Sequence, residues 1–394
     1  MTMRTIRKRP RAGVVALAAA ALSAIVLTGP ARAAGDTDRA SAHEATQRAI
    51  EASVAAGVPG VTAEARDHRG VWKSATGVGD LKTGAPRGKN DRFRIGGVTN
   101  SFVATVLLQM EAERKLDLDD TVERHLPGVV TGNGNDGRTI TVRQLLNHTS
   151  GLFDYLADDT YLRTYVLGDG FFQHRYDVLT PGQRLEVAFS HRPMFTPGAQ
   201  HWPSNTNDVL AALIIEKIGT TYEDEVRERI IEPLGLRATS HPGDSVGIPS
   251  PRSRAYSKLF SAQPDRIEDV TEVHGSQAWG NGDMISSVGD LNRFYRALVT
   301  GKLLPQQQMK AMKTTVDNPL FPGASYGLGI ERLTLSCGTT LWYHDGGAAG
   351  WITLATLTED GRHQFTFNYN GDWEASGILP TLNAEYCDAP TAGR

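Results

Sequence analysis

Two acid–base groups stand side by side late in the chain, and a third precedes them. His344 and Asp345 are neighbours, and Glu331 lies a short distance before them. Imidazole and carboxylate groups commonly act as general acids and bases in catalysis. Adjacent residues of a strand point to opposite faces, so only one of the neighbouring pair is expected to face a cleft along that strand. These three side chains are candidates for proton transfer that needs no covalent intermediate.

The hydroxyl groups of Thr99 and Ser101, which follow Gly97 in the sequence, are candidate nucleophiles. Residues 93–100 lead into a helix that begins with Ser101. On a helix starting near residue 98, at about 100° per residue, Thr99 points about 200° and Ser101 about 40° away from residue 97. Ser101 therefore lies on the same face of the helix as residue 97, about one turn further along it. There, a hydroxyl bonded to a backbone carbonyl is the simpler interpretation.

Two further polar residues have structural interpretations beside the functional ones. Ser204 is typical of a turn or a helix cap. His201, next to Trp202, could reach the mouth of a cleft, although an exposed loop histidine is the simpler interpretation. No spacing of His or Cys residues suits a metal site, and no motif indicates a cofactor.

The first 33 residues have the features of a secretory signal peptide. Five cationic residues precede an apolar run at 12–27, and Ala31-Arg32-Ala33 supplies a small-x-small end. The run is short for a membrane span, and no later stretch is long and apolar enough. The segment holds six Arg or Lys and no acid, so its removal moves the formal charge from -3 to -9. We expect a protein outside the cytoplasm whose acidity disfavours nucleic acid and phosphate.

The spacing of apolar residues predicts the elements that position these groups. Helices are expected at 42–56, 101–113, 140–146, 209–218, 222–231 and 377–386. Strands are expected at 61–66, 71–75, 339–343, 351–357 and 364–369. Strands near both ends with helices between them imply an α/β fold, with one antiparallel sheet built from both termini. The sheet region covers about 40–96 and 291–390, and a mostly helical region, about 97–290, is inserted into it.

Several landmarks resemble the penicillin-recognising serine hydrolases, the family of D-alanyl-D-alanine carboxypeptidases, class C β-lactamases and related esterases. They follow the family's order and spacing, and they are Phe93 to Asn100, Asn147-His148-Thr149-Ser150-Gly151, Ser204-Asn205-Thr206-Asn207, Tyr326-Gly327-Leu328-Gly329 and His344-Asp345-Gly346. The resemblance implies a β-lactamase/transpeptidase-like domain over residues 34–394.

The residues that carry the family's reaction are changed. The Ser-x-x-Lys motif, a nucleophile with a base one helical turn on, has Gly97 and Asn100 in those places. Glycine offers no nucleophile, and a carboxamide is no base. The Tyr-x-Asn motif is replaced by Pro203-Ser204-Asn205, and the middle residue of the His-Thr-Gly motif is Asp345. The acyl-enzyme route is expected to be absent.

The resemblance also implies a ligand cleft. Its expected lining is Gly97, Asn100, Ser204, Asn205, His344, Asp345 and Gly346. His344 holds the family's cleft-facing position, and the N–H of Gly97 could join a donor of the edge strand in an oxyanion pocket. Glu331 stands about where related carboxypeptidases carry an Arg. If Asp345 and Glu331 line the cleft they would repel an anionic ligand. The alternative is that Asp345 faces away and bonds its own glycine turn.

The only cysteines, Cys337 and Cys387, fall in the expected exported part. One disulfide is the simplest account in an oxidising compartment, and close family members carry a similar pair. It would tie the C-terminal helix to a strand of the sheet. The alternative is two separate buried thiols.

Three functions remain open at this point. The first is an exported pseudoenzyme that holds a peptide-like or small-metabolite ligand, or a partner protein, in the old cleft. The second is an enzyme that uses His344, Asp345 or Glu331 in an isomerisation, cyclisation or elimination. The third is residual serine hydrolase or carboxypeptidase activity through Ser101. The missing side chains favour the first, because losing a catalytic serine costs on the order of a millionfold in subtilisin.

Overall fold

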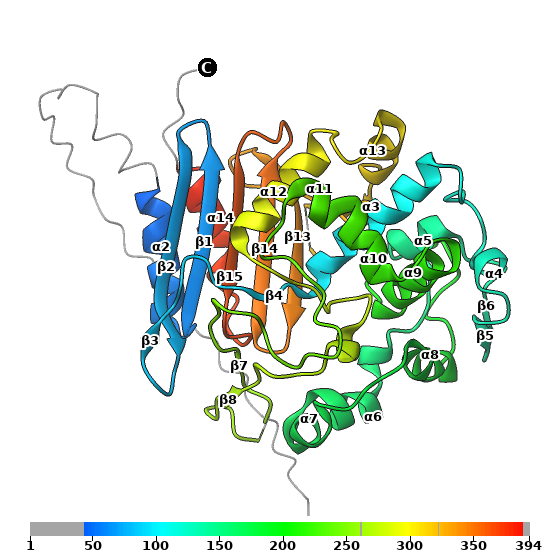
Figure 1. Ribbon diagram of the computed structural model, residues 1–394, viewed down its shortest axis with the longest axis horizontal. Helices are drawn as coiled ribbons and strands as arrows, with labels where there is room; N and C mark the ends of the chain where they lie inside the picture. Colours follow the sequence, from blue (N-terminus) through cyan, green and yellow to red (C-terminus); the bar gives the residue numbers. More distant parts are fainter. Residues whose placement is uncertain (1–42, 261, 322, 389–394) are drawn as a thin grey trace, which may run out of the picture. The chain divides into compact units, whose positions relative to one another are not determined.

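The computed structural model describes residues 43–388, apart from 261 and 322. The expected signal peptide lies outside these residues. A nine-stranded sheet has the strand order β10-β11-β12-β13-β14-β15-β1-β2-β3, with the N-terminal strands in blue in Figure 1. The strands are β1 (Gly60–Asp67), β2 (Gly70–Asp80), β3 (Ala85–Pro86), β10 (Val316–Asp317), β11 (Ala324–Tyr326), β12 (Glu331–Thr334), β13 (Thr340–Ala348), β14 (Trp351–Thr358) and β15 (Gln364–Tyr369).

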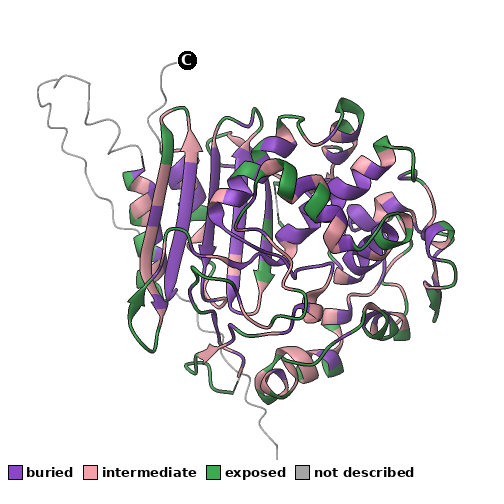
Figure 2. Cartoon of the chain, viewed as in Figure 1, coloured by how far each residue is buried: buried purple, intermediate pink, exposed green. Residues whose placement is uncertain are grey.

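All neighbouring strands of this sheet are antiparallel. The two ends of the chain meet where β1 pairs with β15, with Val61 opposite Tyr369. This pairing confirms the predicted sheet built from both termini. Both strands are buried along most of their length, and Figure 2 shows them in purple.

Helices cover both faces of the sheet. Because side chains alternate along a strand, Ala63 and Phe367 pack into the cluster that α2 (Glu44–Ala55) and α14 (Ile378–Tyr386) cover. Thr366 points to the other face, where its hydroxyl donates to Asn292 of α12 (Val288–Val299) at 2.8 Å. The sheet is therefore the middle layer of three.

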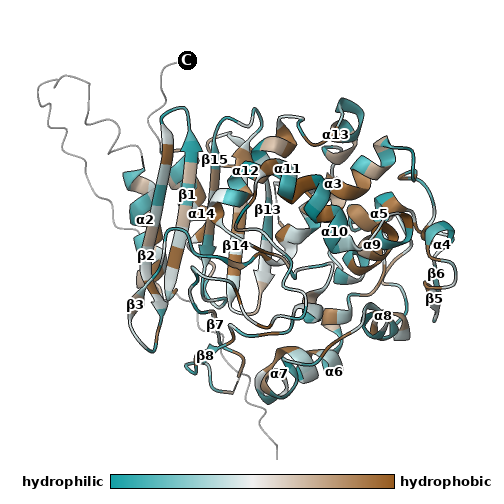
Figure 3. Cartoon of the chain, in the orientation of Figure 1, coloured by the Kyte–Doolittle hydropathy of each residue, from teal (hydrophilic) through white to brown (hydrophobic). Residues whose placement is uncertain are grey.

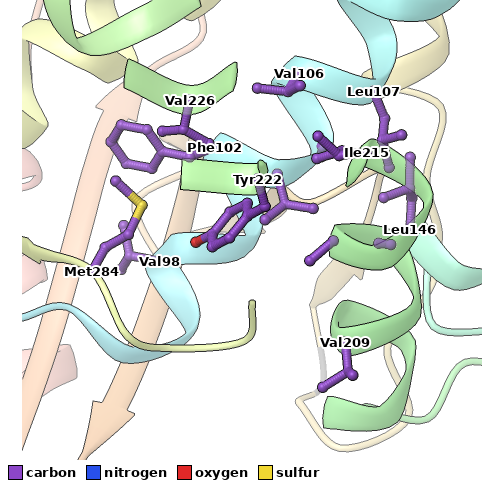
Figure 4. Packing of buried hydrophobic residues seen from close by; sticks show 14 of the residues in the cluster. Val98, Phe102, Val106, Leu107, Leu146, Val209, Ile215, Tyr222, Val226 and Met284 are labelled. Carbon is purple, nitrogen blue, oxygen red and sulfur yellow. The ribbon is translucent and has the colours of Figure 1, made fainter. Parts of the chain in front are cut away.

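The inserted region is built around α3 (Thr99–Ala112). Its residues are buried on almost every side, and Figure 3 shows much of it as apolar. In Figure 4, Phe102 and Val106 of α3 lie among side chains that include Tyr222 and Val226. The residues around α3 come mainly from α9 (Asn205–Ile218), α10 (Tyr222–Val226) and α13 (Gln306–Met312), and α5 (Val142–Leu146) packs on α9. A helix packed on all sides holds the turn before it in a fixed place.

The remaining elements are short. The helices are α4 (Val122–His125), α6 (Asp159–Tyr161), α7 (Gly168–His174), α8 (Pro181–Ser190) and α11 (Glu232–Leu234). Three two-stranded pairs join β4 (Phe93–Arg94) to β9 (Ile285–Ser286), β5 (Thr131–Gly132) to β6 (Asn135–Asp136), and β7 (Tyr256–Ser257) to β8 (Glu268–Asp269).

Each helix and strand predicted from the sequence is present, with shifted ends. Helix α9 begins at Asn205 rather than 209, and β13 continues to Ala348 rather than ending at 343. Glycine and aspartate have low strand propensity, and pairing with β14 overrides it here. Strands β10 to β12 and helix α12 were not predicted. Among the described residues, no helix has the length and apolarity needed to cross a bilayer.

Cys337 and Cys387 form a disulfide, as predicted. Cys337 lies between β12 and β13, and Cys387 follows α14. The bond therefore links the C-terminal helix to the strand region, and it closes a loop with a sequence separation of 50.

Removing this bond should lower the free energy of unfolding by roughly 2 to 4 kcal/mol, because the unfolded chain regains the freedom of a long loop. The measurement is urea denaturation of the wild type and of the double variant Cys337→Ser/Cys387→Ser, each with and without reductant. Reductant should weaken only the wild type. Mass spectrometry that finds two free thiols in the purified wild type would contradict the expectation.

Candidate functional site

The turn before α3 touches the edge of β13 through backbone alone. Gly96 has a φ of +53°, and a Cβ on it would lie 2.2 Å from the carbonyl oxygen of Gly347. A Cβ on Gly346 would lie 2.0 Å from the oxygen of Ile95 and 2.8 Å from the nitrogen of Gly97. No side chain fits at either contact. Glycines at 96 and 346 therefore allow the helical region and the sheet to meet at this point.

Position 97 itself has room for a side chain. A Cβ there would lie 3.2 Å from the Asp345 carbonyl oxygen and 3.6 Å from Cε1 of His344. Such contacts require shifts of only a few tenths of an ångström. The absence of a nucleophile at Gly97 is therefore a feature of this sequence, and crowding does not impose it.

Asn100, one turn into α3, lies against a buried acid that the sequence analysis missed. Burial raises the pKa of Asp208 well above its usual value, and a hydrogen bond with Asn100 only partly offsets this. Nε2 of His148 is 3.8 Å from the same carboxyl group, and burial lowers the pKa of His148 to about 3. Burial therefore disfavours the charged forms of both Asp208 and His148 at the place where the family has a lysine.

Of the family's Tyr-x-Asn motif, this chain keeps only the asparagine, Asn205. Pro203 is exposed and Ser204 is buried, with no hydrogen-bond partner for its hydroxyl among the described residues. Asn205 begins α9, and its Nδ2 donates to Asp154 at 2.9 Å. Its Oδ1 lies 2.9 Å from the amide group of Asn281. Asp154 therefore fixes the orientation of Asn205, the residue of this motif that reaches the pocket described below.

The candidate nucleophile Ser101 is fully buried. Its hydroxyl donates to the carbonyl of Gly329 at 2.6 Å and lies 2.8 Å from the hydroxyl of Tyr295. Thr99 is also fully buried. The structural interpretation of Ser101 is confirmed, and a route through its hydroxyl has no access to a substrate.

His201 is not an exposed loop residue, and that expectation was wrong. It is 2% exposed, and its ring stacks on Tyr326 with centroids 4.8 Å apart. Its Nδ1 bonds the carbonyl of Asn147 at 2.8 Å. Aromatic stacking and this hydrogen bond stabilise the buried ring, although its Nε2 has no hydrogen-bond partner among the described residues. His201 does not line the pocket described below.

His344 is buried beneath position 97. Its Nε2 lies 2.9 Å from the hydroxyl of Tyr326, and its Nδ1 bonds the carbonyl of Asp345. Burial lowers the pKa of this imidazole. Both ring nitrogens thus have partners inside the protein, which leaves neither free to take a proton from a ligand in this arrangement.

Glu331 and Asp345 lie together on the sheet face that carries Tyr343. Glu331 pairs with Tyr343 across the strands and accepts a hydrogen bond from its hydroxyl at 2.8 Å. Burial, with the nearby Asp345, raises the pKa of Glu331 well above its usual value. Asp345 is exposed. It lies two residues beyond Tyr343 and therefore on the same face. The alternative that Asp345 faces away is favoured, although its partner is Glu331 and not the glycine turn.

Glu331, His344 and Asp345 also form the one metal-ligand-type group found among residues 43–388. Their ligand atoms lie within 4.8 Å of one another. A cation bound there would have to displace a partner of His344, because both of its ring nitrogens are engaged. The geometry therefore offers no ready-made metal site.

A pocket of about 440 Å³ opens beside position 97. Gly97, Asn205 and Gly347 form part of its wall, and none of Asn100, Ser204, His344, Asp345, Glu331 and Gly346 lines it. The rest of the lining includes five aromatic residues: Tyr155, Tyr161, Tyr165, Phe171 and Trp351. The lining also includes Arg94, His274 and Asp372, so the open pocket combines apolar walls with a few polar and charged groups, which is a usual composition for a small-molecule site.

Comparison with known proteins agrees with this fold. The profile of the Beta-lactamase family matches residues 46–372, so the chain belongs to that family of penicillin-recognising serine hydrolases. A D-stereospecific amidohydrolase from Streptomyces sp. is similar, at 48% identity and a TM-score of 0.83, and the match covers 88% of this chain and 99% of that one. A D-amino acid amidase from Ochrobactrum anthropi SV3, complexed with L-phenylalanine amide, has 27% identity and a TM-score of 0.73 over 87% and 95% of the two chains.

Curated relatives are more distant. A D-aminopeptidase of Brucella anthropi is 27% identical over 328 residues, which are 82% of this chain and 58% of the relative. The chain spans 58% to 65% of the length of the first four curated relatives that it matches. The predicted family and the predicted fold are confirmed.

Restoring acylation should require four changes. The variant Gly97→Ser should label with a fluorescent penicillin hardly above background, because no base stands beside the new hydroxyl. In the triple variant with Asn100→Lys and Pro203→Tyr, Asp208 would hold the new ammonium in its charged form. Adding Asp208→Asn should raise the labelling rate about tenfold for each unit by which the lysine pKa falls. The rates are measured by gel fluorescence.

The matched control carries Ala at position 97 with the other three changes, and it should not label. Fast labelling of the single variant Gly97→Ser would contradict the expectation, because it would show that a base is already in place.

The raised pKa of Glu331 should make stability depend on pH. Above its ordinary pKa of 4.5, the unfolded chain loses the proton of Glu331 while the folded chain keeps it. The wild type should therefore lose about 1.4 kcal/mol of stability per pH unit, from about pH 4.5 up to the folded pKa. Glu331→Gln should match the wild type near pH 4 and exceed it at pH 7 in urea denaturation. The exposed control Glu359→Gln should follow the wild type, and an unchanged pH dependence in Glu331→Gln would refute the assignment.

Proposed function

We propose that this chain is a binding protein that holds an amide- or ester-like small ligand without forming an acyl-enzyme. One observation carries the proposal. The pocket beside position 97 is intact, while the nucleophile and base of the family reaction are replaced by Gly97 and Asn100. A pocket that can bind a carbonyl group and cannot attack it acts as a receptor.

Backbone groups supply the recognition of the carbonyl in this proposal. Gly97 and Gly347 both line the pocket, and both carry an N–H. Two such donors aimed at one oxygen are the usual composition of an oxyanion pocket. The amide of Asn205 is oriented by Asp154 and supplies a third polar group. These groups need no titratable side chain.

The aromatic lining supports a ligand with an aromatic or large apolar side chain. Tyr165 is the half-buried ring of this lining, whereas Tyr155 and Trp351 are fully buried, and an aromatic pair adds about 0.5 to 1.5 kcal/mol beyond area burial. The similar amidase from Ochrobactrum anthropi SV3 was crystallised with L-phenylalanine amide, which is a ligand of this kind. Amides of aromatic amino acids are therefore the ligand class that we propose.

The acid–base alternative has less support. His344 has both ring nitrogens engaged, and burial raises the pKa of Glu331, which makes it a poorer proton donor. Asp345 is exposed but does not line the pocket. The expectation that Asp345 and Glu331 repel anionic ligands in the pocket loses its basis for the same reason. No feature of the pocket specifically favours a protein partner.

We also propose that the protein is exported. The disulfide between Cys337 and Cys387 supports this, because such bonds persist mainly in oxidising compartments. The proposed division into a sheet region and an inserted helical region follows the same family pattern.

Calorimetric titration with D- and L-phenylalanine amide tests the proposal. At least one enantiomer should bind about tenfold or more tightly than alanine amide of the same configuration, because the ring fills the aromatic pocket. No ammonia should be released, and mass spectrometry should find no adduct with a fluorescent penicillin or an acyl-serine probe. Turnover, or stoichiometric labelling, would overturn the proposal.

A pair of glycine variants tests where the ligand binds: one fills the pocket, and the matched control lies outside it. A Cβ on Gly347 meets nothing within 4 Å, so Gly347→Leu should block the pocket without straining the fold. Gly247 is equally open and lies outside the pocket, so Gly247→Leu should bind as the wild type does. Equal binding by both variants would place the ligand elsewhere.

A further inference from the structure

A second depression, of about 460 Å³, lies at the start of α12 beside β1 and β2. It shares no lining residue with the aromatic pocket. One short segment nevertheless contributes to both: Arg92 lines this depression, and Arg94 lines the aromatic pocket. We call it the basic pocket.

The basic pocket concentrates positive charge. Its wall contains five cationic side chains, Arg66, Lys73, Arg92, Arg237 and Arg293, against two carboxylates, Glu64 and Asp290. The formal excess is three positive charges. The whole chain carries a net charge of -3, so this local sign is opposite to the overall one. Local clustering, and not net charge, sets the potential that a bound ion experiences.

Both carboxylates are already neutralised within the protein. Glu64 is buried, with the ammonium of Lys73 at 3.2 Å and the guanidinium of Arg66 at 3.6 Å. Asp290 is buried and pairs with Arg293. It also accepts the N–H of Ala238 at 2.8 Å.

Arg92 and Arg237 are the two cations of this pocket that are not paired with Glu64 or Asp290. Among the described residues, neither has a carboxylate within 4.0 Å. The Arg92 guanidinium lies 3.4 Å from the carbonyl of Arg237, and the Arg92 backbone N–H donates to Pro251 at 2.9 Å. These contacts hold Arg92 in place, and the exposed Arg237, which lines the same wall, also lacks a neutralising acid among the described residues.

The start of α12 adds to the same potential. Ser287 caps the helix and lines the pocket together with Gly289. A helix of 12 residues carries a partial positive charge at its N-terminus. Arginine is suited to phosphate because its fork of N–H groups binds two oxygens at once.

We propose that the basic pocket is an anion site, distinct from the aromatic pocket, that binds the dianionic phosphate group of a phosphate monoester or free phosphate. Arg92 and Arg237 supply the direct contacts, and Lys73 and Arg293 remain paired with their acids. This proposal departs from the expectation, drawn from net charge, that phosphate is disfavoured.

Calorimetric titration with three probes at constant ionic strength tests the site. Inorganic phosphate at pH 8 and glycerol 1-phosphate are dianions, and dimethyl phosphate is a monoanion of similar shape. Both dianions should bind about tenfold or more tightly than dimethyl phosphate, because one charge-assisted contact is lost with the second charge. If glycerol 1-phosphate binds more tightly than inorganic phosphate, a monoester is identified as the ligand. Equal affinity of the two would identify the free phosphate ion.

The double variant Arg92→Gln/Arg237→Gln should weaken phosphate binding at least about a hundredfold, since two contacts of about tenfold each are removed. Arg362→Gln, at an exposed arginine outside the pocket, should bind as the wild type does. Circular dichroism shows whether the double variant is folded. If it misfolds, the single variant Arg237→Gln, at an exposed residue, should still lose about tenfold.

Binding that Arg237→Gln leaves unchanged, or that sodium chloride at equal ionic strength reproduces, would overturn the proposal. Phenylalanine amide binding should be the same in the double variant and the wild type, so the two sites are tested separately.

Discussion

The backbone contact between the turn at residues 96–98 and the edge of β13 is the constraint on which the site depends. Gly96 and Gly346 allow carbonyl and N–H groups of the two segments to approach where any Cβ would collide. This contact joins the inserted helical region to the sheet, and α3 holds it from below. It also places Gly97 and Gly347 on one wall of the aromatic pocket. The site survives because its frame is backbone, which the loss of side chains does not alter.

Several polar side chains around this frame lie in pairs. Asn100 lies against Asp208, His344 bonds Tyr326, and Glu331 lies beside Asp345. Burial disfavours the charged forms of Asp208, His344 and Glu331. Neutral, hydrogen-bonded groups avoid the desolvation cost of a buried charge, but they also provide little drive for proton transfer. The same pairing that stabilises the interior therefore removes the reactivity that the family uses.

Fold and reaction depend on different residues in this family. The sheet order, the three layers and the disulfide rest on apolar alternation, on glycines at close contacts and on one cysteine pair. The family reaction rests on a few polar side chains, of which this chain retains only Asn205 and His344 in the motif positions. A family match over residues 46–372 consequently establishes the fold without establishing the chemistry.

The sequence by itself determined the family, the main helices and strands, the disulfide and the absence of a nucleophile at position 97. These follow from local periodicity, from motif order and from residue identity, which do not require a folded chain. It did not reveal strands β10 to β12, which are short and gain their stability by pairing with β13.

Tertiary structure alone decided which groups lie together and how they are charged. It placed Asp208 against Asn100, buried His201 under its loop, and turned Asp345 toward Glu331 and away from the aromatic pocket. It also gathered Arg92 and Arg237 on one wall from distant parts of the chain. Burial and the proximity of charges are properties of residues far apart in sequence, so the protonation and accessibility of a side chain can be known only once the chain has folded.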